Sequence, residues 1–209
     1  MKHQYYGDSR DIAKWTTLVQ LARMHDLASI VQIAMLTPDD DTRHGGQRDD
    51  PADADPDVRR FFVEERERFA RDPELRSIAG ATRLGEWLHP PLAIEVMDAP
   101  FQPRSRAAYF TNAGSRLSSL GVPTLAFLDP DVGIAATRAT EKHVACDELA
   151  QIWEALDLGS VLAVFQFEQR RPGWDKTAVE LFARAVGVSP QAVTCWQYPR
   201  VAFLSSLKI

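Results

Sequence analysis

Apolar residues recur along the chain in two spacings, one typical of helices and one typical of buried strands. Between residues 8 and 25 they lie three to four positions apart, from Ile12 to Ala22, and Asp8 or Ser9 can cap this segment. Four continuous apolar runs have the length of strands: 29–36, 92–97, 124–128 and 161–165. The pattern therefore predicts a first helix followed by several buried strands.

Helical periodicity returns between these apolar runs. It predicts a charged helix from Phe61 to about Ala70 and further helices at 106–120, 141–156 and 175–186, followed by extended segments at 193–198 and 201–204. Because strands alternate with helices and most are continuously apolar, the sheet should be mainly parallel and covered on both faces. The expected fold is α/β, a single Rossmann-like three-layer domain spanning residues 1–209.

One long polar stretch interrupts this alternation at 42–57. It is rich in Asp, Gly and Arg, and Pro51 and Pro56 block regular structure. A segment of this kind inside a compact domain is typical of a functional loop, so we interpret it as a loop or lid rather than a linker.

Composition narrows the class of protein. The net charge of −5 and the scattered basic residues argue against a broad nucleic-acid footprint. Cys146 and Cys195 each stand alone, without ligand spacing, which argues against a zinc site and a disulfide framework. Neither a signal peptide nor a membrane-length apolar run is present, so a cytoplasmic protein without a membrane partner is expected. The oligomeric state is left open.

Two aspartates directly follow the apolar run 124–128. Asp129 and Asp131 stand at a spacing that lets paired carboxylates hold a divalent ion or divide the roles of acid and base. Pro130 stiffens the turn, and Gly133 allows a backbone conformation that other residues avoid. The plainer interpretation is a good strand-to-helix turn with a capping aspartate, and it stays open.

A second polar cluster surrounds the start of the first helix. Spacings of three place Asp8 near Asp11 and Asp11 near Lys14. Free N–H groups at the helix start, with Lys14 behind them, would hold an anionic ligand. The alternative is an ordinary capped helix with ion pairs along its surface. The candidate cofactor-binding residues here are Tyr5, Gly7, Asp8, Asp11 and Lys14.

The ends of the first two strands add further candidates. Leu36 and Thr37 occupy the place where a doubly wound fold presents its glycine-rich loop, yet no GxGxxG stands there, which argues against a standard dinucleotide site. Asp98 ends the second strand, where a carboxylate often meets a ribose hydroxyl, although a turn role is the alternative.

Two motifs together carry a resemblance to known proteins. The segments Gly7-Asp8-x-x-Asp11-x-x-Lys14-Trp15 and Asp129-Pro130-Asp131-Val132-Gly133 resemble those of a bacterial and phage family with the same pair. More distantly, the chain resembles the class I, S-adenosylmethionine-dependent rRNA adenine-N6 methyltransferases. In that family Gly-Asn-x-Ala-Asp-x-x-Lys-His opens the first helix and Asp-Pro-Pro-Tyr follows the fourth strand. Here Asp131-Val132 stand where the family has Pro-Tyr.

The resemblance implies a methyltransferase-like Rossmann domain that binds a nucleoside-containing ligand, with S-adenosylmethionine as cofactor and a nucleotide or nucleic acid as partner. Asp129, Asp131 and Lys14 would then be the catalytic residues. The first rival is a metal-dependent nuclease or phosphoesterase in which Asp8, Asp129 and Asp131 bind Mg²⁺ or Mn²⁺. The second is a non-catalytic binding protein, associated with phage or with defence.

Overall fold

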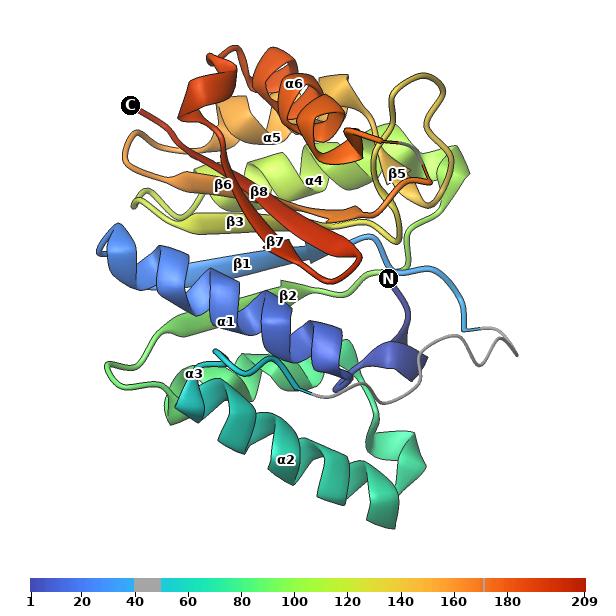
Figure 1. The fold of residues 1–209 in the computed structure, drawn as a ribbon, viewed down its shortest axis with the longest axis vertical. Helices are drawn as coiled ribbons and strands as arrows, with labels where there is room; N and C mark the ends of the chain where they lie inside the picture. The colour runs from blue at the N-terminus through green and yellow to red at the C-terminus, as the bar shows by residue number, and fades with distance from the viewer. Residues whose placement is uncertain (40–49, 171) are drawn as a thin grey trace.

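The computed structural model describes residues 1–39, 50–170 and 172–209 (Figure 1). The α-helices are α1 (Ser9–Met24), α2 (Pro56–Arg71), α3 (Leu84–Trp87), α4 (Arg106–Ser118), α5 (Cys146–Ala155) and α6 (Trp174–Val186). Short 3-10 helices are η1 (His3–Tyr5), η2 (Pro73–Leu75), η3 (Ile78–Arg83), η4 (Pro103–Ser105) and η5 (Pro190–Ala192). The strands are β1 (Ser29–Ala34), β2 (Ala93–Met97), β3 (Leu125–Asp129), β4 (Gly133–Ile134), β5 (His143–Val144), β6 (Val161–Phe167), β7 (Thr194–Tyr198) and β8 (Val201–Leu207).

The main sheet has six strands in the order β2-β1-β3-β6-β8-β7, and β4 pairs with β5 separately. The first four strands are parallel, whereas β8 runs antiparallel to both β6 and β7. The predicted fold class is confirmed: the chain is α/β, with a mainly parallel sheet in a three-layer, Rossmann-like arrangement.

Helices cover both faces of this sheet (Figure 1). One core packs α1, α2 and η3 against the first face and contains Trp15 and Phe127. The other packs α4, α5 and α6 against the opposite face and contains Phe110 and Phe182. Since successive strand residues point to opposite faces, the two faces need two apolar sets, which explains the continuous apolar runs of the sequence.

The order of the strands reverses between β1 and β3. The connection from β1 to β2 carries α2 and α3 on the α1 face, whereas the connection from β2 to β3 carries α4 on the other face. Open α/β sheets bind ligands outside the carboxyl ends of the strands at such a switch point. Here those ends are Ala34 and Asp129, which are paired in register.

The predicted helix at 141–156 is wrong at its start. Val144 is fully buried in β5, and α5 begins only at Cys146. The side chain of Glu148 accepts a hydrogen bond from the N–H of Ala145 at 2.7 Å, which fixes the helix start at that point. Periodicity missed this boundary because Glu141 and Lys142 favour helices as strongly as the residues that follow.

The predicted lid at 42–57 is described only in part, because residues 42–49 lie outside the described residues. From residue 50 the chain runs toward α2, whose start is capped by Asp55 at 3.0 Å from the N–H of Asp57. Asp55 also pairs with Arg23 of α1 at 2.6 Å. The helix therefore begins at Pro56, five residues before the predicted start at Phe61. Over the ranges the structure describes, no helix is both long and apolar enough to cross a membrane.

Candidate functional site

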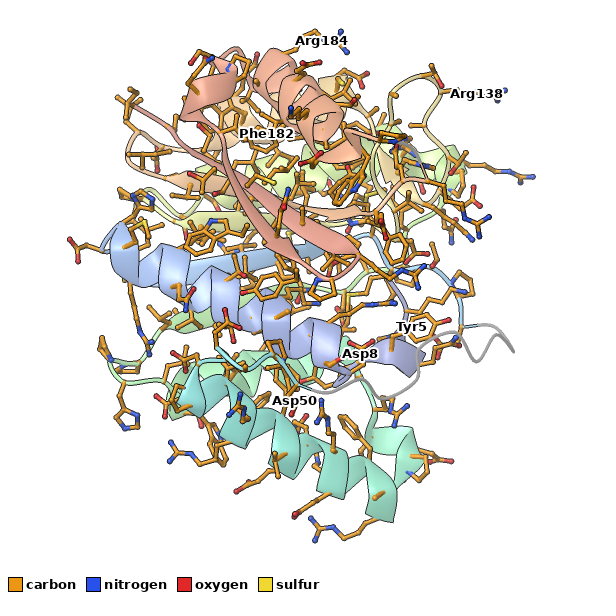
Figure 2. All side chains as sticks on the ribbon, viewed as in Figure 1. Tyr5, Asp8, Asp50, Arg138, Phe182 and Arg184 are labelled. Carbon is orange, nitrogen blue, oxygen red and sulfur yellow. The ribbon has the colours of Figure 1, made fainter. Side chains whose placement is uncertain are left out.

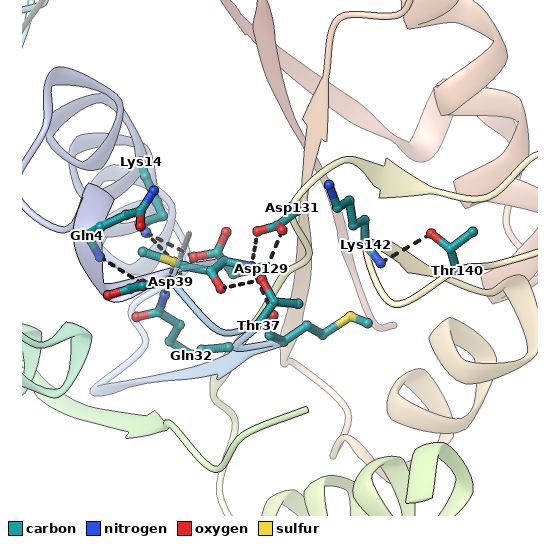
Figure 3. A network of polar contacts seen from close by, with 12 residues as sticks. Gln4, Lys14, Gln32, Thr37, Asp39, Asp129, Asp131, Thr140 and Lys142 are labelled. Atoms are coloured by element: carbon teal, nitrogen blue, oxygen red, sulfur yellow. Dashed lines mark hydrogen bonds and ion pairs between the residues drawn. The ribbon is translucent and has the colours of Figure 1, made fainter. Parts of the chain in front are cut away.

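A buried ion cluster lies where α1 crosses the carboxyl ends of β1 and β3 (Figure 3). Lys14 Nζ is 2.5 Å from Asp11 Oδ1 and 2.9 Å from Asp129 Oδ2. The three side chains are only 4% to 6% exposed. Burial by itself lowers the pKa of Lys14, but the carboxylates of Asp11 and Asp129 outweigh it and raise the pKa overall. Lys14 is therefore a permanent cation that holds Asp129 in place.

Gln32 completes this cluster and was missed by the sequence analysis. It is a fully buried polar residue in the middle of β1, and its Nε2 donates to Asp129 Oδ2 at 2.7 Å. Among the described residues, no donor reaches Gln32 Oε1. The signal was present in the sequence, because a glutamine inside an otherwise apolar strand is costly to bury unless it has a polar partner.

The start of α1 is capped by the side chain of Asp8, which corrects one expectation. Asp8 Oδ1 accepts hydrogen bonds from the N–H groups of Arg10 and Asp11 at 2.9 and 3.1 Å. Gly7 N–H donates to Asp11 Oδ2 at 2.8 Å. The idea that free N–H groups at this helix start hold an anion is therefore wrong for these three groups. Burial and the charge of Asp11 raise the pKa of Asp8 to about 6.

Asp131 lies at the rim of the same crevice. Its carboxylate forms an ion pair with the amino group of Met1, and Thr37 Oγ1 lies 3.1 Å from Asp131 Oδ2. The amino group of Met1 also donates to the carbonyl of Met35 at 2.9 Å. The Met1 sulfur is 3.5 Å from Lys14 Nζ, so this side chain lies directly over the buried cluster. Asp129 and Asp131 thus face different cations.

A cavity of about 80 Å³ opens above these groups. Its walls come from the N-terminal segment, from α1 and from the turn after β3: Met1, Lys2, Tyr5, Asp8, Arg10, Asp11, Lys14, Asp129, Pro130, Asp131 and Phe165. The structure therefore brings Tyr5, Asp8, Asp11 and Lys14 together with both aspartates of the turn. Tyr5 and Asp8 lie near one another in Figure 2.

Four predicted binding residues, Leu36, Thr37, Asp98 and Gly7, do not line this cavity. Leu36 is buried and bridges to Pro100, while Thr37 contacts Asp131 and the carbonyl of Met1 without lining the cavity itself. Asp98 is exposed at the end of β2 and does not line the cavity. Gly7 contributes through its backbone, since its positive φ of 88° lets the chain turn into α1.

A tyrosine from the opposite face also reaches this edge of the sheet. Tyr109 of α4 donates from its hydroxyl to the carbonyl of Ala34 at 2.7 Å. Burial, followed by the charges of Asp129 and Asp98, raises the pKa of Tyr109. It is therefore a neutral hydroxyl that fixes the carboxyl end of β1.

The metal alternative was tested against the same geometry. Within residues 1–39, 50–170 and 172–209, no group of three or more His, Cys, Asp or Glu side chains is arranged to hold a metal ion. Asp8 caps α1, Asp129 faces Lys14, and Asp131 faces Met1. Each carboxylate is therefore already engaged by a different donor.

The chain has little similarity to known proteins. No protein-family model matches the chain, and no curated protein matches it. Among solved structures, the chain is similar to the rRNA methyltransferase aviRa from Streptomyces viridochromogenes, with 17% identity and a TM-score of 0.30. The match covers 90% of this chain and 70% of that one. Similarity at this level assigns neither a family nor an activity.

Proposed function

We propose that the crevice at the carboxyl ends of β1 and β3 binds a nucleoside-containing ligand, with S-adenosylmethionine as cofactor for methyl transfer to a nucleotide or nucleic acid. One observation carries the proposal, namely the buried cluster of Lys14, Asp129 and Gln32 at the switch point. Burying charges is costly unless they are paired, and such clusters concentrate at functional sites.

One acceptor atom of this cluster supports ligand binding. Lys14 and Gln32 both donate to Asp129 Oδ2 through their side-chain nitrogens. The other side-chain atom of Gln32, the buried Oε1, has no hydrogen-bond donor among the described residues. An unsatisfied buried acceptor costs about 1–3 kcal/mol, so a ligand that donates to it recovers this free energy. Amino and hydroxyl groups of a nucleoside are donors of the required kind.

The charges of the cavity wall also fit the cofactor. Four aspartates line it, against three basic side chains, Lys2, Arg10 and Lys14, and the amino group of Met1. A ligand that displaces the Met1 amino group leaves an excess of carboxylates, which favours an ammonium and a sulfonium group over a bare phosphate. When bound, S-adenosylmethionine supplies an electrophilic methyl group. Asp131 already faces an amino group in this structure, which supports a role in holding the ammonium of the ligand.

The residues of the cluster then take different roles. Lys14 stays protonated, so it positions Asp129 and does not act as a base. Asp129 Oδ1 would accept a hydrogen bond from the amino or hydroxyl group to be methylated, because Lys14 and Gln32 fix the other oxygen of the same carboxylate. A fixed acceptor needs no reorganisation during the reaction.

The cavity is too small for a nucleoside unless part of its wall moves. At about 80 Å³ it is smaller than the roughly 300 Å³ at which pockets for drug-sized ligands begin. The Met1 side chain fills the space between Lys14 and Gln32, since its sulfur contacts both. A nucleoside would therefore displace the segment at Met1 and Lys2. Tyr5 and Phe165 would remain as the ring-bearing walls.

The experiment is thermal denaturation with S-adenosylmethionine, S-adenosylhomocysteine, nucleotides, Mg²⁺ and Mn²⁺ added separately. A ligand specific to the folded state stabilises it by about 2.7 kcal/mol at a hundred times its Kd. Asp129→Asn should reduce the stabilisation by S-adenosylmethionine. Glu65→Gln is the matched control, because Glu65 is a buried carboxylate paired with Arg83, and neither residue lines the cavity.

Each outcome separates the candidate functions. Stabilisation by the methionine-derived ligands that Asp129→Asn removes and Glu65→Gln keeps would support the proposal. Stabilisation by metal alone, lost in Asp131→Asn, would replace it with the phosphoesterase. Ligand binding without turnover on any nucleic acid would favour the non-catalytic binding protein.

A further inference from the structure

A phenylalanine beside the crevice is flanked by two arginines from different elements. Phe167 ends β6, and the guanidinium carbon of Arg10 lies 5.3 Å from its ring centroid. The guanidinium carbon of Arg200, from the turn between β7 and β8, lies 5.5 Å from the same centroid. Cation–π contact of this kind restrains a guanidinium while its N–H donors stay available for a second partner.

The backbone at Arg200 is an unusual place for an arginine. Pro199 and Arg200 form the turn between β7 and β8, and Arg200 has a φ of 69°. Proline followed by a residue of positive φ is the pattern of a type II turn, in which glycine or asparagine normally takes the second place. The carbonyl of Arg200 accepts from the N–H of Glu168 at 2.8 Å, which fixes the turn beside β6. A strained residue of this kind points to a role for its side chain.

Both guanidinium groups are available for an anion. Across the described ranges, the Arg10 guanidinium forms no ion pair or hydrogen bond, and its charge acts on Asp8. Arg200 pairs with Glu168 at 3.6 Å, with the two side chains 52% and 44% exposed. An exposed pair at this distance is weak and gives way to a stronger partner.

One of the two arginines, Arg10, also lines the proposed crevice. Arg10 lines the cavity above Lys14 and a neighbouring cavity of about 290 Å³, whose wall includes Tyr198 and Pro199. The patch of Arg10, Phe167 and Arg200 therefore adjoins the site through Arg10. Planar guanidinium groups match the geometry of phosphate oxygens, which they bind in a bidentate manner.

We propose that the patch of Arg10, Phe167 and Arg200 binds the phosphodiester backbone of a nucleic-acid substrate whose target base enters the crevice. The inference rests on the proposed function and deepens it, because it assigns a polymer rather than a free nucleotide as substrate. The patch is small, so it positions a strand locally and does not require a broad basic face.

The test is fluorescence anisotropy with labelled single-stranded RNA and DNA of the same mixed sequence, titrated at several salt concentrations. Arg200→Asn should weaken binding about tenfold, since a charge-assisted hydrogen bond of about 1.5 kcal/mol is lost. The slope of log K against log salt should fall by about 0.7 for this lost phosphate contact. Glu168→Gln should strengthen binding, because it removes the competing carboxylate.

The midpoint of thermal unfolding distinguishes an arginine that binds nucleic acid from one that only stabilises the fold. Asparagine tolerates a positive φ, so Arg200→Asn should keep or raise the midpoint of thermal unfolding while binding weakens. Arg184→Ala is the control, because Arg184 is exposed on α6, far from Asp8 in Figure 2, and its loss should leave binding unchanged.

Three results would overturn the inference: no oligonucleotide binding by the wild-type protein, equal binding by Arg200→Asn and Arg184→Ala, or equally tight binding of a polyglutamate peptide. Weaker RNA or DNA binding by Arg200→Asn, with S-adenosylmethionine giving no thermal stabilisation of any variant, would uphold the patch and refute the proposed cofactor.

Discussion

Replacing Lys14 by methionine measures how much the buried cluster of Lys14, Asp11 and Asp129 contributes to the free energy of unfolding. The variant removes the ammonium that Asp11 and Asp129 share, while methionine fills most of the same volume. Breaking a buried ion pair from one side costs about 3–5 kcal/mol. In the variant, Gly7 N–H still donates to Asp11 and Gln32 Nε2 still donates to Asp129. We therefore expect the loss of unfolding free energy to lie at the lower end of this range, at about 3 kcal/mol.

The assay is urea denaturation followed by circular dichroism. With a slope of about 2–3 kcal/mol per molar, a loss of 3 kcal/mol lowers the midpoint by about 1–1.5 M. Adding Asp129→Asn to Lys14→Met should recover part of the loss, because the unpaired carboxylate becomes a neutral amide. The two changes should be coupled by about 0.5–3 kcal/mol, as expected for residues in direct contact.

Arg60→Met is the matched control for this series. Arg60 pairs with Asp57 at 2.7 Å but is 58% exposed, so its loss should cost less than about 1 kcal/mol. If Lys14→Met cost no more than Arg60→Met, or if Asp129→Asn gave no recovery, the reasoning about the buried cluster would be refuted.

The pKa of Asp8, raised to about 6, lies above its unfolded value, so ionisation of Asp8 should lower the free energy of unfolding as pH rises from about 4 through 6. Asp8→Asn keeps the cap, and in urea denaturation at several pH values it should lose that part of the dependence; an identical profile would contradict the assignment. Gly133→Ala should lower the free energy of unfolding by roughly 1–3 kcal/mol more than Gly121→Ala in the same assay. Both glycines have a positive φ, but only at Gly133 would a Cβ overlap the side chain of Gln166. Arg106→Met should speed amide hydrogen exchange between residues 130 and 144, since Arg106 donates to the carbonyl of Thr140 at 2.9 Å and to Glu148 at 2.7 Å; unchanged exchange there would argue against this anchoring.

The fold was predictable because its signals are local. Apolar runs of strand length gave the parallel strands, and the three-to-four spacing gave α1 together with its cap at Asp8. The start of α5 was not predictable in the same way, because the pairing of Val144 with Ile134 is a tertiary contact that overrides the helix preference of Glu141 and Lys142.

The candidate site was predictable only in its parts. The sequence indicated Lys14 and Asp129 separately, but these residues are 115 positions apart and no spacing rule predicts their contact. Alternation along β3 would have placed Asp129 on the face of Phe127, which is the α1 face, once the direction of the strand was known. Gln32 was overlooked because it was read as part of an apolar run, and Arg200 because a turn position has no periodicity.

The position of β8 within the sheet has a consequence for how the chain folds during synthesis. β8 is the last of the six strands in chain order, yet it lies between β6 and β7. Until residues 201–207 leave the ribosome, the nascent sheet ends at β6, whose apolar edge has unpaired N–H and C=O groups. Such an edge can pair with another chain, so the interval before β8 inserts is when the protein is most exposed to aggregation and most dependent on chaperones.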